Sequence, residues 1–321
     1  MKIAFIFDKQ QEFAGAKYVY RVLQAEGHET AVFKFDQLKQ IPDYKPDLVL
    51  AMDDGAHYIC DIDIHPKAIW IIDTHLSYLC DEVMVKSFDI IFSNQKNDSE
   101  RLGKKFKYVY WLPVVADPEL HGPVAVPKKE FDIAMVGGLF RGTRKVMMRK
   151  LKELYPNSYI GGADWGHIGE IYSKSKIVVN YAIENGINNR AFEGPCSGSL
   201  LITNKLKDNG LEDLFEDGKE IVTYSDFSDL KNKIDYYLAH NEERERIAAA
   251  GRARVLKEHT YKDRVDFMLS KINELRPQLA TKKESQFHFN KLKLELKFKR
   301  ALWFVVKVLR RIKWKIQELV S

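Results

Sequence analysis

The chain has 321 residues, 45% of them apolar and 30% charged, a composition that excludes a disordered chain and is ordinary for a folded one. This length predicts two domains, because a single hydrophobic core rarely extends over so many residues. The net charge of +6 comes from the end of the chain: residues 282–321 hold 12 Lys and Arg against 3 Asp and Glu, whereas residues 1–281 hold 39 against 42.

The sequence gives no sign of export or of a membrane span. Only five apolar residues follow Lys2 before Asp8, too few for a signal peptide, and no window of about 18 uncharged apolar residues exists. The three cysteines form no CxxC pair, which argues against a disulfide framework or a zinc cluster. We therefore expect a cytoplasmic protein with buried, reduced thiols.

Short apolar runs alternate with helical segments through the first third of the chain. The run Lys2–Phe7 (KIAFIF) predicts a strand buried on both faces, and Lys17–Glu26 predicts a helix that ends at Gly27. Strands that alternate with helices indicate a parallel sheet covered on both sides. Further strands are expected at Thr30–Phe35, Asp47–Met52, Ala68–Ile72, Asp89–Phe92 and Tyr108–Leu112.

A proline-rich segment separates this pattern from a second one. Leu112–Lys129 contains four of the ten prolines, which indicates an extended connection between domains. The pattern then starts again with a strand at Phe131–Val136 and a helix at Thr143–Tyr155. Further strands are expected at Lys176–Asn180, Leu200–Thr203 and Glu220–Tyr224, and helices at Ser228–His240, at Glu242–His259 and from Thr260 onward.

A glycine-rich turn follows the first strand of the second half. The backbone N–H groups of Gly137 and Gly138, together with the start of the next helix, can bind an anion, and Arg141 and Arg144 can pair with phosphate oxygens. Glycine turns with solvated arginines are also common in this architecture, so the turn alone does not decide between the two interpretations.

The segment after Asn180 places an arginine and a glutamate three residues apart in a short predicted helix that ends before Gly198. At the carboxyl edge of a parallel sheet, Glu193 could accept two hydrogen bonds from a ribose diol and Arg190 could reach a phosphate. The alternative is a local surface ion pair, which contributes under about 1 kcal/mol.

Several segments of the chain resemble those of a known protein family. The segments DIAMVGG, IVVN, NRAFEGPCSGSLLIT, LEDLFEDGKEIVTYSD and ERERIAAAGRARVLKEHTYKDR, with WIIDTH and YVYWLPVVADPEL before them, resemble CgeB-like glycosyltransferases of group 1 type. The most specific motif is R-x-F-E-x-x-x-x-G, and the resemblance covers about four-fifths of the chain.

The resemblance implies an α/β fold with two Rossmann-like domains facing a cleft (GT-B), and the charge distribution adds a basic amphipathic tail. Residues 1–125 would form the domain that binds the acceptor, and residues 126–259 the domain that binds the nucleotide sugar. Residues 260–280 would form a helix that returns to the first domain, and residues 281–321 would form the tail. The expected activity is polysaccharide biosynthesis by transfer from a UDP-, GDP- or dTDP-linked sugar to a saccharide, lipid-linked or protein acceptor.

The resemblance also assigns roles to individual residues. Glu193 matches the acid that binds the ribose, Arg190 an arginine that faces the phosphates, and Glu184 a glutamate near the sugar. The interval between the two glutamates is nine residues where eight is usual in the family, which leaves the role of Glu184 and retention of configuration open. The expected donor-binding residues are Gly137, Gly138, Arg141, Arg144, Asn188, Asn189, Arg190, Glu193 and Gly194.

We expect chemistry without a metal or a cofactor, because arginines, backbone amides and a helix N-terminus can stabilise the leaving diphosphate. A DxD pattern occurs at Asp61 and Asp63, where solvated acids explain it better. For an inverting reaction, His75 with Asp73 is the best candidate base and Asp8 the next, since imidazole titrates near neutral pH. Strand-end Asp and His residues also form caps and turns.

The tail combines an apolar stripe with basic residues. Residues 299–319 predict a helix that binds an anionic membrane surface, at the inner face of the cytoplasmic membrane. The alternative is a helix that docks on the protein body or on a partner subunit. Binding to nucleic acid is not expected. Leu292–Phe298 alternates apolar and charged or basic residues as a strand does. The stripe consists of Leu302, Val305, Val306, Leu309, Ile312, Ile316 and Leu319.

Two other functions compatible with such a chain are a sugar-nucleotide epimerase of the same fold and a non-catalytic nucleotide-sugar-binding or membrane-recruited protein. Product analysis would separate an epimerase from a transferase, because only the transferase consumes an acceptor. A nicotinamide-dependent dehydrogenase is disfavoured, because the segment after the first strand (DKQQEFAGAK) lacks the pattern G-x-G-x-x-G.

Overall fold

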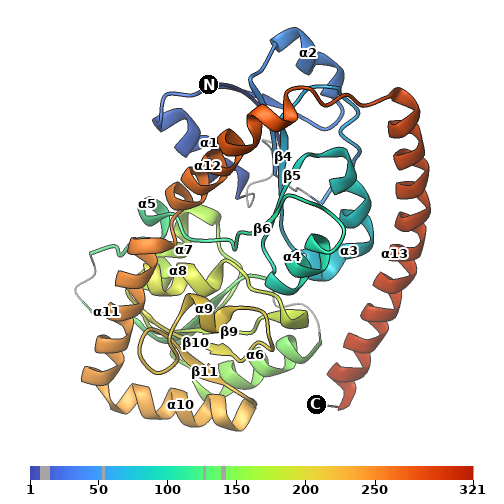
Figure 1. Ribbon diagram of the computed structural model, residues 1–321. Coiled ribbons are helices and arrows are strands. Elements are labelled where there is room, and N and C mark those ends of the chain that lie inside the picture. The colour runs from blue at the N-terminus through green and yellow to red at the C-terminus, as the bar shows by residue number, and fades with distance from the viewer. Residues whose placement is uncertain (8–14, 53–54, 126–127, 139–141, 321) are drawn as a thin grey trace. The chain divides into compact units, whose positions relative to one another are not determined.

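The computed structural model describes residues 1–7, 15–52, 55–125, 128–138 and 142–320. The chain forms two compact units (Figure 1). Unit 1 comprises residues 1–114 and 261–306, and unit 2 comprises residues 115–260 and 307–321. Each unit contains one parallel sheet, so the expected α/β architecture with two parallel sheets is confirmed.

Unit 1 is a six-stranded parallel sheet with the strand order β2-β1-β3-β4-β5-β6. The strands are β1 (Lys2–Ile6), β2 (Glu29–Phe33), β3 (Leu48–Met52), β4 (Lys67–Ile71), β5 (Ile90–Ser93) and β6 (Val109–Trp111). Every residue of β3, β4 and β5 is buried, as expected for central strands covered on both faces. The helices are α1 (Ala16–Ala25), α2 (Ile41–Tyr44), α3 (Thr74–Met84), α4 (Lys96–Gly103), α12 (Tyr261–Leu279) and the first part of α13 (Gln286–Val320).

Helix α12 belongs to unit 1 although it follows unit 2 in the sequence. It lies beside α1 (Figure 1), and the rings of Tyr18 and Tyr261 stack with their centroids 4.4 Å apart. The guanidinium of Arg264 donates a hydrogen bond to the carbonyl oxygen of Pro113. These buried contacts connect α12 to segments of unit 1 that lie far away in the sequence, Arg264 and Pro113 being 151 residues apart.

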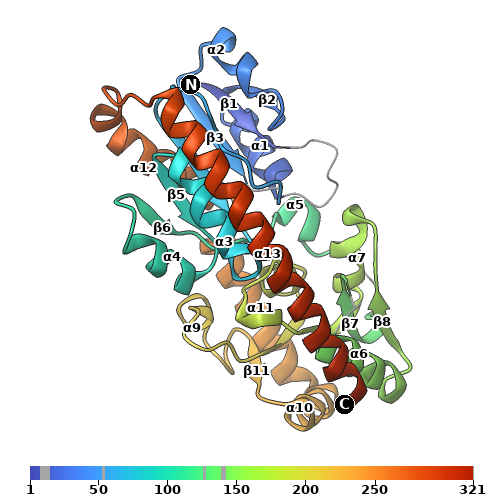
Figure 2. The ribbon, with the colours of Figure 1, turned by 90° about the vertical axis from the view of Figure 1, so that its right-hand side faces the viewer.

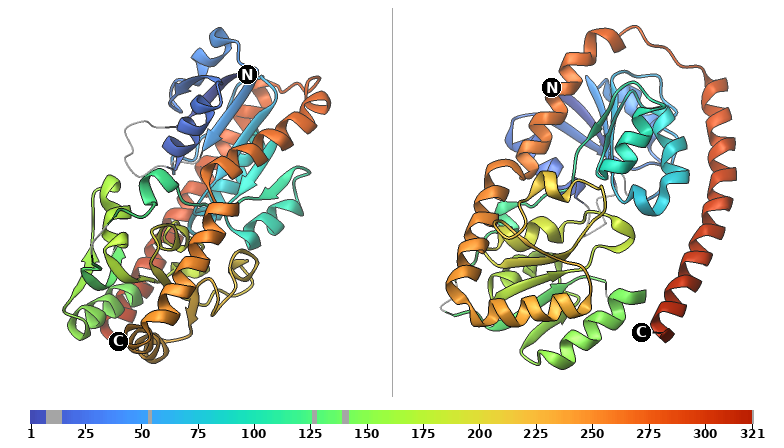
Figure 3. Two further views of the ribbon diagram at one scale, coloured as in Figure 1. Left: turned by 90° about the vertical axis from the view of Figure 1, so that its left-hand side faces the viewer. Right: turned by 60° about the horizontal axis from the view of Figure 1, so that its bottom comes forward.

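Unit 2 is a five-stranded parallel sheet with the strand order β11-β10-β9-β7-β8. The strands are β7 (Phe131–Val136), β8 (Ser158–Gly161), β9 (Ser175–Asn180), β10 (Leu200–Asn204) and β11 (Val222–Tyr224). Figure 3 (right) shows α6 in green and α10 and α11 in orange beside these strands. The helices are α5 (Pro118–His121), α6 (Gly142–Leu154), α7 (Ile168–Ser173), α8 (Arg190–Cys196), α9 (Leu211–Leu214), α10 (Phe227–Ala239) and α11 (Asn241–Glu258).

The expected strands and long helices are present, with ends that differ by one or two residues. Strand β8 has no counterpart among the predicted strands, since its sequence Ser-Tyr-Ile-Gly has only two apolar side chains and none of its residues is fully buried. The connection after Leu112 is not wholly extended, because Pro118–His121 form the short helix α5. The carboxylate of Asp117 caps α5 by accepting the N–H of Glu119.

The strand-like alternation at Leu292–Phe298 does not correspond to a strand. The whole segment Gln286–Val320 is one helix, drawn in red in Figure 2. In a helix, Phe289, Leu292 and Leu296 share a face, and they pack in unit 1 against Ile59, Cys80 and Val83. Leu294 and Phe298 point away and are exposed. Burial of one helical face therefore outweighs the alternating pattern.

The apolar stripe in the later part of α13 is exposed and is not buried against the described residues. Its seven members are between 36% and 80% exposed. Trp303, on another face of the helix, donates its indole N–H to the carbonyl oxygen of Leu76 in unit 1. Within the described part of the chain, no helix is long and apolar enough to cross a membrane.

Candidate functional site

The carboxyl edge of the unit 2 sheet holds most of the predicted site residues. Along the chain, β8 lies on one side of β7, and β9, β10 and β11 follow on the other side. The order therefore changes direction between β7 and β9. In open α/β sheets ligands bind at such a switch point, outside the carboxyl ends of the strands.

Arg190 lies at this switch point. It begins helix α8 and is only 8% exposed. Its Nε donates to the carbonyl oxygen of Val136 at 3.0 Å and to the Tyr172 hydroxyl at 3.2 Å, and its Nη1 donates to Oδ1 of Asn180 at 2.7 Å. Nη2 also donates to Val136 O. Arg190 thus connects the ends of β7 and β9.

Gly137 allows Arg190 to approach the chain this closely. A Cβ at Gly137 would lie 2.5 Å from Nη2 of Arg190, and the φ angle of +135° is one that residues with a side chain rarely adopt. The turn after β7 therefore requires glycine at this position. Gly138 follows it, and its carbonyl oxygen accepts a hydrogen bond from the guanidinium of Arg144.

Arg144 brings a second positive charge to the same place. Burial and, next, the positive charge of Arg190 lower the pKa of Arg144 to about 10. Its Nε is buried and makes no hydrogen bond within the described residues. A buried arginine whose charge is disfavoured by a neighbouring arginine is stabilised by a bound anion. Arg141, the other predicted arginine, lies outside the described residues.

The residues around the start of α8 have different roles. Asn188 donates its side-chain amide to Oδ1 of Asn180 at 3.2 Å, and the carbonyl oxygen of Asn189 accepts the N–H groups of Phe192 and Glu193. Gly194 faces the sheet: a Cβ there would lie 3.1 Å from the side chain of Val178. The structure therefore places Gly194 where α8 packs closely on β9.

Glu193 lies in the first turn of α8 and is 9% exposed. Its Oε1 is 3.7 Å from Nε2 of His121. The Nδ1 of that imidazole accepts the backbone N–H of Asp117 at 3.0 Å, so a neutral His121 carries its proton on Nε2, toward Glu193. The carboxylate thus has a buried imidazole on one side and the positive end of α8 beside it.

The first turn of α6 continues the site on the other side of the glycine turn. The backbone N–H of Gly142 donates to Oε1 of Glu318, from the end of α13, at 2.7 Å. Glu184 lies in a short 3₁₀ turn, Ile183–Asn185, with a φ angle of +47°. Its Oε1 accepts the indole N–H of Trp314 at 3.3 Å, and Nζ of Lys313 is 3.7 Å away.

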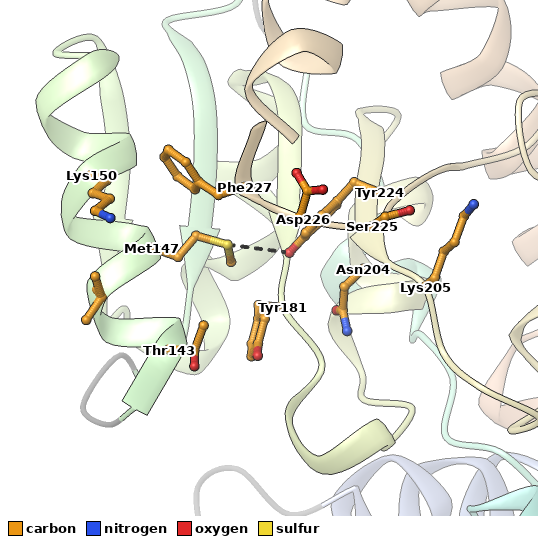
Figure 4. Close-up of a pocket in the computed structure, with 11 residues that line it drawn as sticks. Thr143, Met147, Lys150, Tyr181, Asn204, Lys205, Tyr224, Ser225, Asp226 and Phe227 are labelled. Carbon is orange, nitrogen blue, oxygen red and sulfur yellow. Dashed lines mark hydrogen bonds between the residues drawn. The ribbon is translucent and has the colours of Figure 1, made fainter. Parts of the chain in front are cut away.

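A pocket of about 480 Å³ opens beside the first turn of α6, at the carboxyl ends of β9, β10 and β11 (Figure 4). It combines aromatic rings with polar groups, and Lys150 lies over the ring of Phe227 at 5.7 Å. Thr143 from the first turn of α6 lines it, so the pocket borders the start of the helix that follows the glycine turn. The other lining residues include Met147, Tyr181, Asn204, Tyr224 and Asp226.

The predicted catalytic pair belongs to unit 1. Asp73 precedes α3, is exposed and has a φ angle of +53°, and its backbone oxygen accepts a hydrogen bond from Ser77. His75 is half-buried in the first turn of α3, directly after β4. The structure thus places both at the carboxyl edge of the unit 1 sheet. Asp8 lies outside the described residues.

The acids of the DxD pattern hold the start of α13 in unit 1. Asp61 pairs with Lys293, and Asp63 accepts the backbone N–H of Glu284 at 2.8 Å. That hydrogen bond lowers the pKa of Asp63. Among the described residues no group of three acids, histidines or cysteines is arranged to hold a metal ion.

Three residues of the site were not predicted from the sequence. Asn180 and Tyr172 hold Arg190, and His121 lies beside Glu193. Asn180 ends a strand and follows three apolar residues, Ile177–Val179. A polar residue at the end of such an apolar run is a signal that could have identified it. Tyr172 and His121 come from α7 and α5, and only the folded chain brings them to α8.

Part of the second half of the chain matches a known family in sequence. Residues 143–270 match the family described as Glycosyl transferase-like. No curated protein matches the chain in sequence.

Solved structures match over most of the chain. The sucrose-phosphate synthase of Thermosynechococcus elongatus is 14% identical, with a TM-score of 0.62 over 86% of this chain and 99% of that chain. HepE of Anabaena, solved with UDP and glucose, is 11% identical, with a TM-score of 0.64 over 86% and 100%. An α-glucosyltransferase solved with UDP and DNA is 13% identical, with a TM-score of 0.59 over 85% and 99%. The chain therefore has the GT-B fold.

Proposed function

We propose that this protein is a glycosyltransferase that uses a nucleoside diphosphate sugar as donor and needs no metal ion. The observation that carries the proposal is the pair of crowded arginines at the switch point of unit 2, one of them 8% exposed, with the carboxylate of Glu193 three residues further along α8. A nucleoside diphosphate carries the matching groups, a pyrophosphate and a ribose diol.

The donor would bind through contacts that the described residues can make. Glu193 accepts hydrogen bonds from the two ribose hydroxyls, since a carboxylate can accept two at once. Arg144, the free N–H directions of the Arg190 fork and the start of α6 face the diphosphate. The Oδ1 of Asn188 is buried without a hydrogen bond among the described residues, so it can accept a hydrogen bond from a hydroxyl of the donor.

The chemistry is substitution at the anomeric carbon. An acceptor hydroxyl oxygen forms the new bond to that carbon, the bond from the carbon to the diphosphate oxygen breaks, and the acceptor proton passes to a base. The arginines stabilise the charge that develops on the leaving diphosphate. In our proposal the base for an inverting reaction comes from the pair His75 and Asp73, with His75 as the first candidate, and unit 1 binds a saccharide, lipid-linked or protein acceptor.

The similar structures support a nucleotide donor. HepE was solved with UDP-glucose as well as with UDP, and the α-glucosyltransferase with UDP. We assign the chain to the CgeB-like subgroup on the motif that runs from Arg190 to Gly198, and we place it in the cytoplasm in polysaccharide biosynthesis.

We also infer a membrane partner for α13. Its exposed stripe is apolar, and the residues beside it are basic, including Arg311 and Lys315. An apolar face with a basic border suits the interface of an anionic membrane, where each basic residue contributes about 1 kcal/mol. Sedimentation with phosphatidylglycerol vesicles tests this: Leu309→Asp should abolish binding, and equal binding by the variant would refute the assignment.

A nucleotide screen tests the donor assignment. We expect one of UDP, GDP and dTDP to raise the melting temperature of the protein, and Glu193→Ala to lose most of that shift because the ribose contacts are gone. Glu212→Ala, an exposed glutamate on α9, is the matched control and should keep the full shift. If no nucleotide stabilises the protein, or if both variants respond as the wild type does, the proposal is wrong.

A second measurement identifies the reaction. The corresponding sugar nucleotide is incubated with and without mixed glycan and lipid acceptors, and the products are analysed. A transferase releases nucleoside diphosphate and forms a new glycoside only with an acceptor. Conversion to an epimer without an acceptor would indicate an epimerase, and binding without any turnover a non-catalytic protein.

A further inference from the structure

The last two turns of α13 lie on the start of α6. Oε1 of Glu318 accepts the backbone N–H of Gly142 at 2.7 Å, and Oε2 is 3.1 Å from Nζ of Lys145. All three residues belong to unit 2. A carboxylate from the end of the chain is therefore bound at the N-terminus of a 13-residue helix that follows the glycine turn.

This position has the chemistry of an anion site. The first N–H groups of a helix have no partner within the helix and carry partial positive charge. Arg144, in the same turn, has a lowered pKa because of burial and the nearby positive charge of Arg190. Glu318 thus supplies negative charge where the local arrangement disfavours more positive charge.

Glu318 is an unusual residue in this part of the sequence. Glu318 is the single acidic residue among residues 296–321, a stretch that otherwise carries eight Lys and Arg. Basic side chains are favoured near a helix C-terminus and acidic ones are not, so α13 gains nothing by itself from an acid near its end. The contact with the start of α6 gives this glutamate its stabilising partners.

Packing holds the end of α13 in this position. A Cβ at Gly142 would lie 3.0 Å from Cδ1 of Trp314, so the indole packs directly on the glycine, whose φ angle is +62°. The same indole donates its N–H to Glu184, and Lys313 lies 3.7 Å from that carboxylate. Three side chains of α13, with Gln317 beside them, thus cover the start of α6 and the Glu184 turn.

We propose that the end of α13 is an internal competitor of the donor: Glu318 occupies the anion site at the start of α6, and a diphosphate must displace it in order to bind there. This inference rests on the proposed function for the identity of the ligand. Because the open state is only a fraction of the population, the apparent affinity for the diphosphate is reduced by that fraction.

Pyrophosphate and nucleotide titrations of the full chain test the competition. Glu318→Ala should bind inorganic pyrophosphate about tenfold more tightly than the wild type does, which corresponds to about 1.4 kcal/mol. Trp314→Ala, which loosens the packing on Gly142, should shift the affinity in the same direction. Glu295→Ala is the matched control on α13, because Glu295 pairs with Lys86 in unit 1, and its affinity should equal that of the wild type.

The outcomes separate the two proposals. Equal or weaker pyrophosphate binding by Glu318→Ala, or no pyrophosphate binding by any of the proteins, would overturn the competition. If Glu318→Ala binds pyrophosphate more tightly but no protein binds UDP, GDP or dTDP, the competition stands and the nucleotide-donor function fails. The melting temperature of each variant, measured alongside, shows that it is folded.

Discussion

Arg190 is the residue whose replacement tests the structural reasoning most directly. Replacement by methionine keeps a long apolar stem but removes every N–H donor of the guanidinium. Val136 O and Asn180 Oδ1 then lose their strongest partners, and both residues are buried. We expect the loss to separate the ends of β7 and β9 and to destabilise unit 2 even without a ligand.

The expected size follows from these contacts. A buried acceptor without a partner costs about 1–3 kcal/mol. The Tyr172 hydroxyl can still donate to the carbonyl oxygen of Val136 at 3.5 Å, and the Asn188 amide still donates to Asn180 at 3.2 Å, so both losses are partial. Removal of one of two crowded charges offsets part of the rest. A net loss of about 2–3 kcal/mol lowers the melting temperature by about 4–12 °C.

Differential scanning calorimetry of the ligand-free protein measures this effect. Arg190→Lys keeps the charge but not the planar fork, so its melting temperature should lie between those of the wild type and the methionine variant. Arg246→Met is the control, since this α11 side chain is largely exposed and its loss should change stability by less than about 0.5 kcal/mol. A methionine variant that melts with the wild type would refute the role of Arg190 as a connection between strands.

Two further predictions concern the glycine turn and the tail. Gly137→Ala should lower the unfolding free energy measured in urea by about 1–3 kcal/mol, because the alanine Cβ would meet Arg190 and the φ angle is strained for alanine. Gly162 has open space around it, so Gly162→Ala is the control and should unfold like the wild type. Leu292→Asp should lower the unfolding free energy by about 3–5 kcal/mol, because Leu292 is 3% exposed and the substitution would bury a charge. Leu294 is 71% exposed, so Leu294→Asp should leave the unfolding free energy nearly unchanged. The reverse order for the two leucines would indicate that the helical faces of α13 are assigned wrongly.

The sequence determined the elements of both sheets because their strands are strongly apolar. Phe131–Val136 was predicted with its observed ends, since five of its six residues are apolar and glycines follow it directly. The motif around Arg190 and Glu193 was visible for a similar reason, as charged residues in a short glycine- and proline-containing segment between two apolar strands are uncommon. Such local signals depend only on neighbouring residues.

The sequence could not show what each charged residue contacts. Arg190 could be expected to face an anion, but its hydrogen bonds to Val136 and Asn180 depend on the order of the strands, which brings β7 beside β9. Strand order is a long-range property, and the periodicity of single segments does not contain it. The same holds for His121 beside Glu193, which come from α5 and α8.

The tail shows the division most clearly. Its sequence determined an amphipathic basic helix over residues 299–319, because apolar side chains recur there every three or four positions. Only the tertiary structure decided which face docks: Phe289, Leu292 and Leu296 are buried in unit 1, Glu318 binds the start of α6 in unit 2, and the predicted stripe stays exposed. When a helix has apolar residues on more than one face, the face that becomes buried depends on the surfaces against which it can pack. Those surfaces exist only once both sheets have formed.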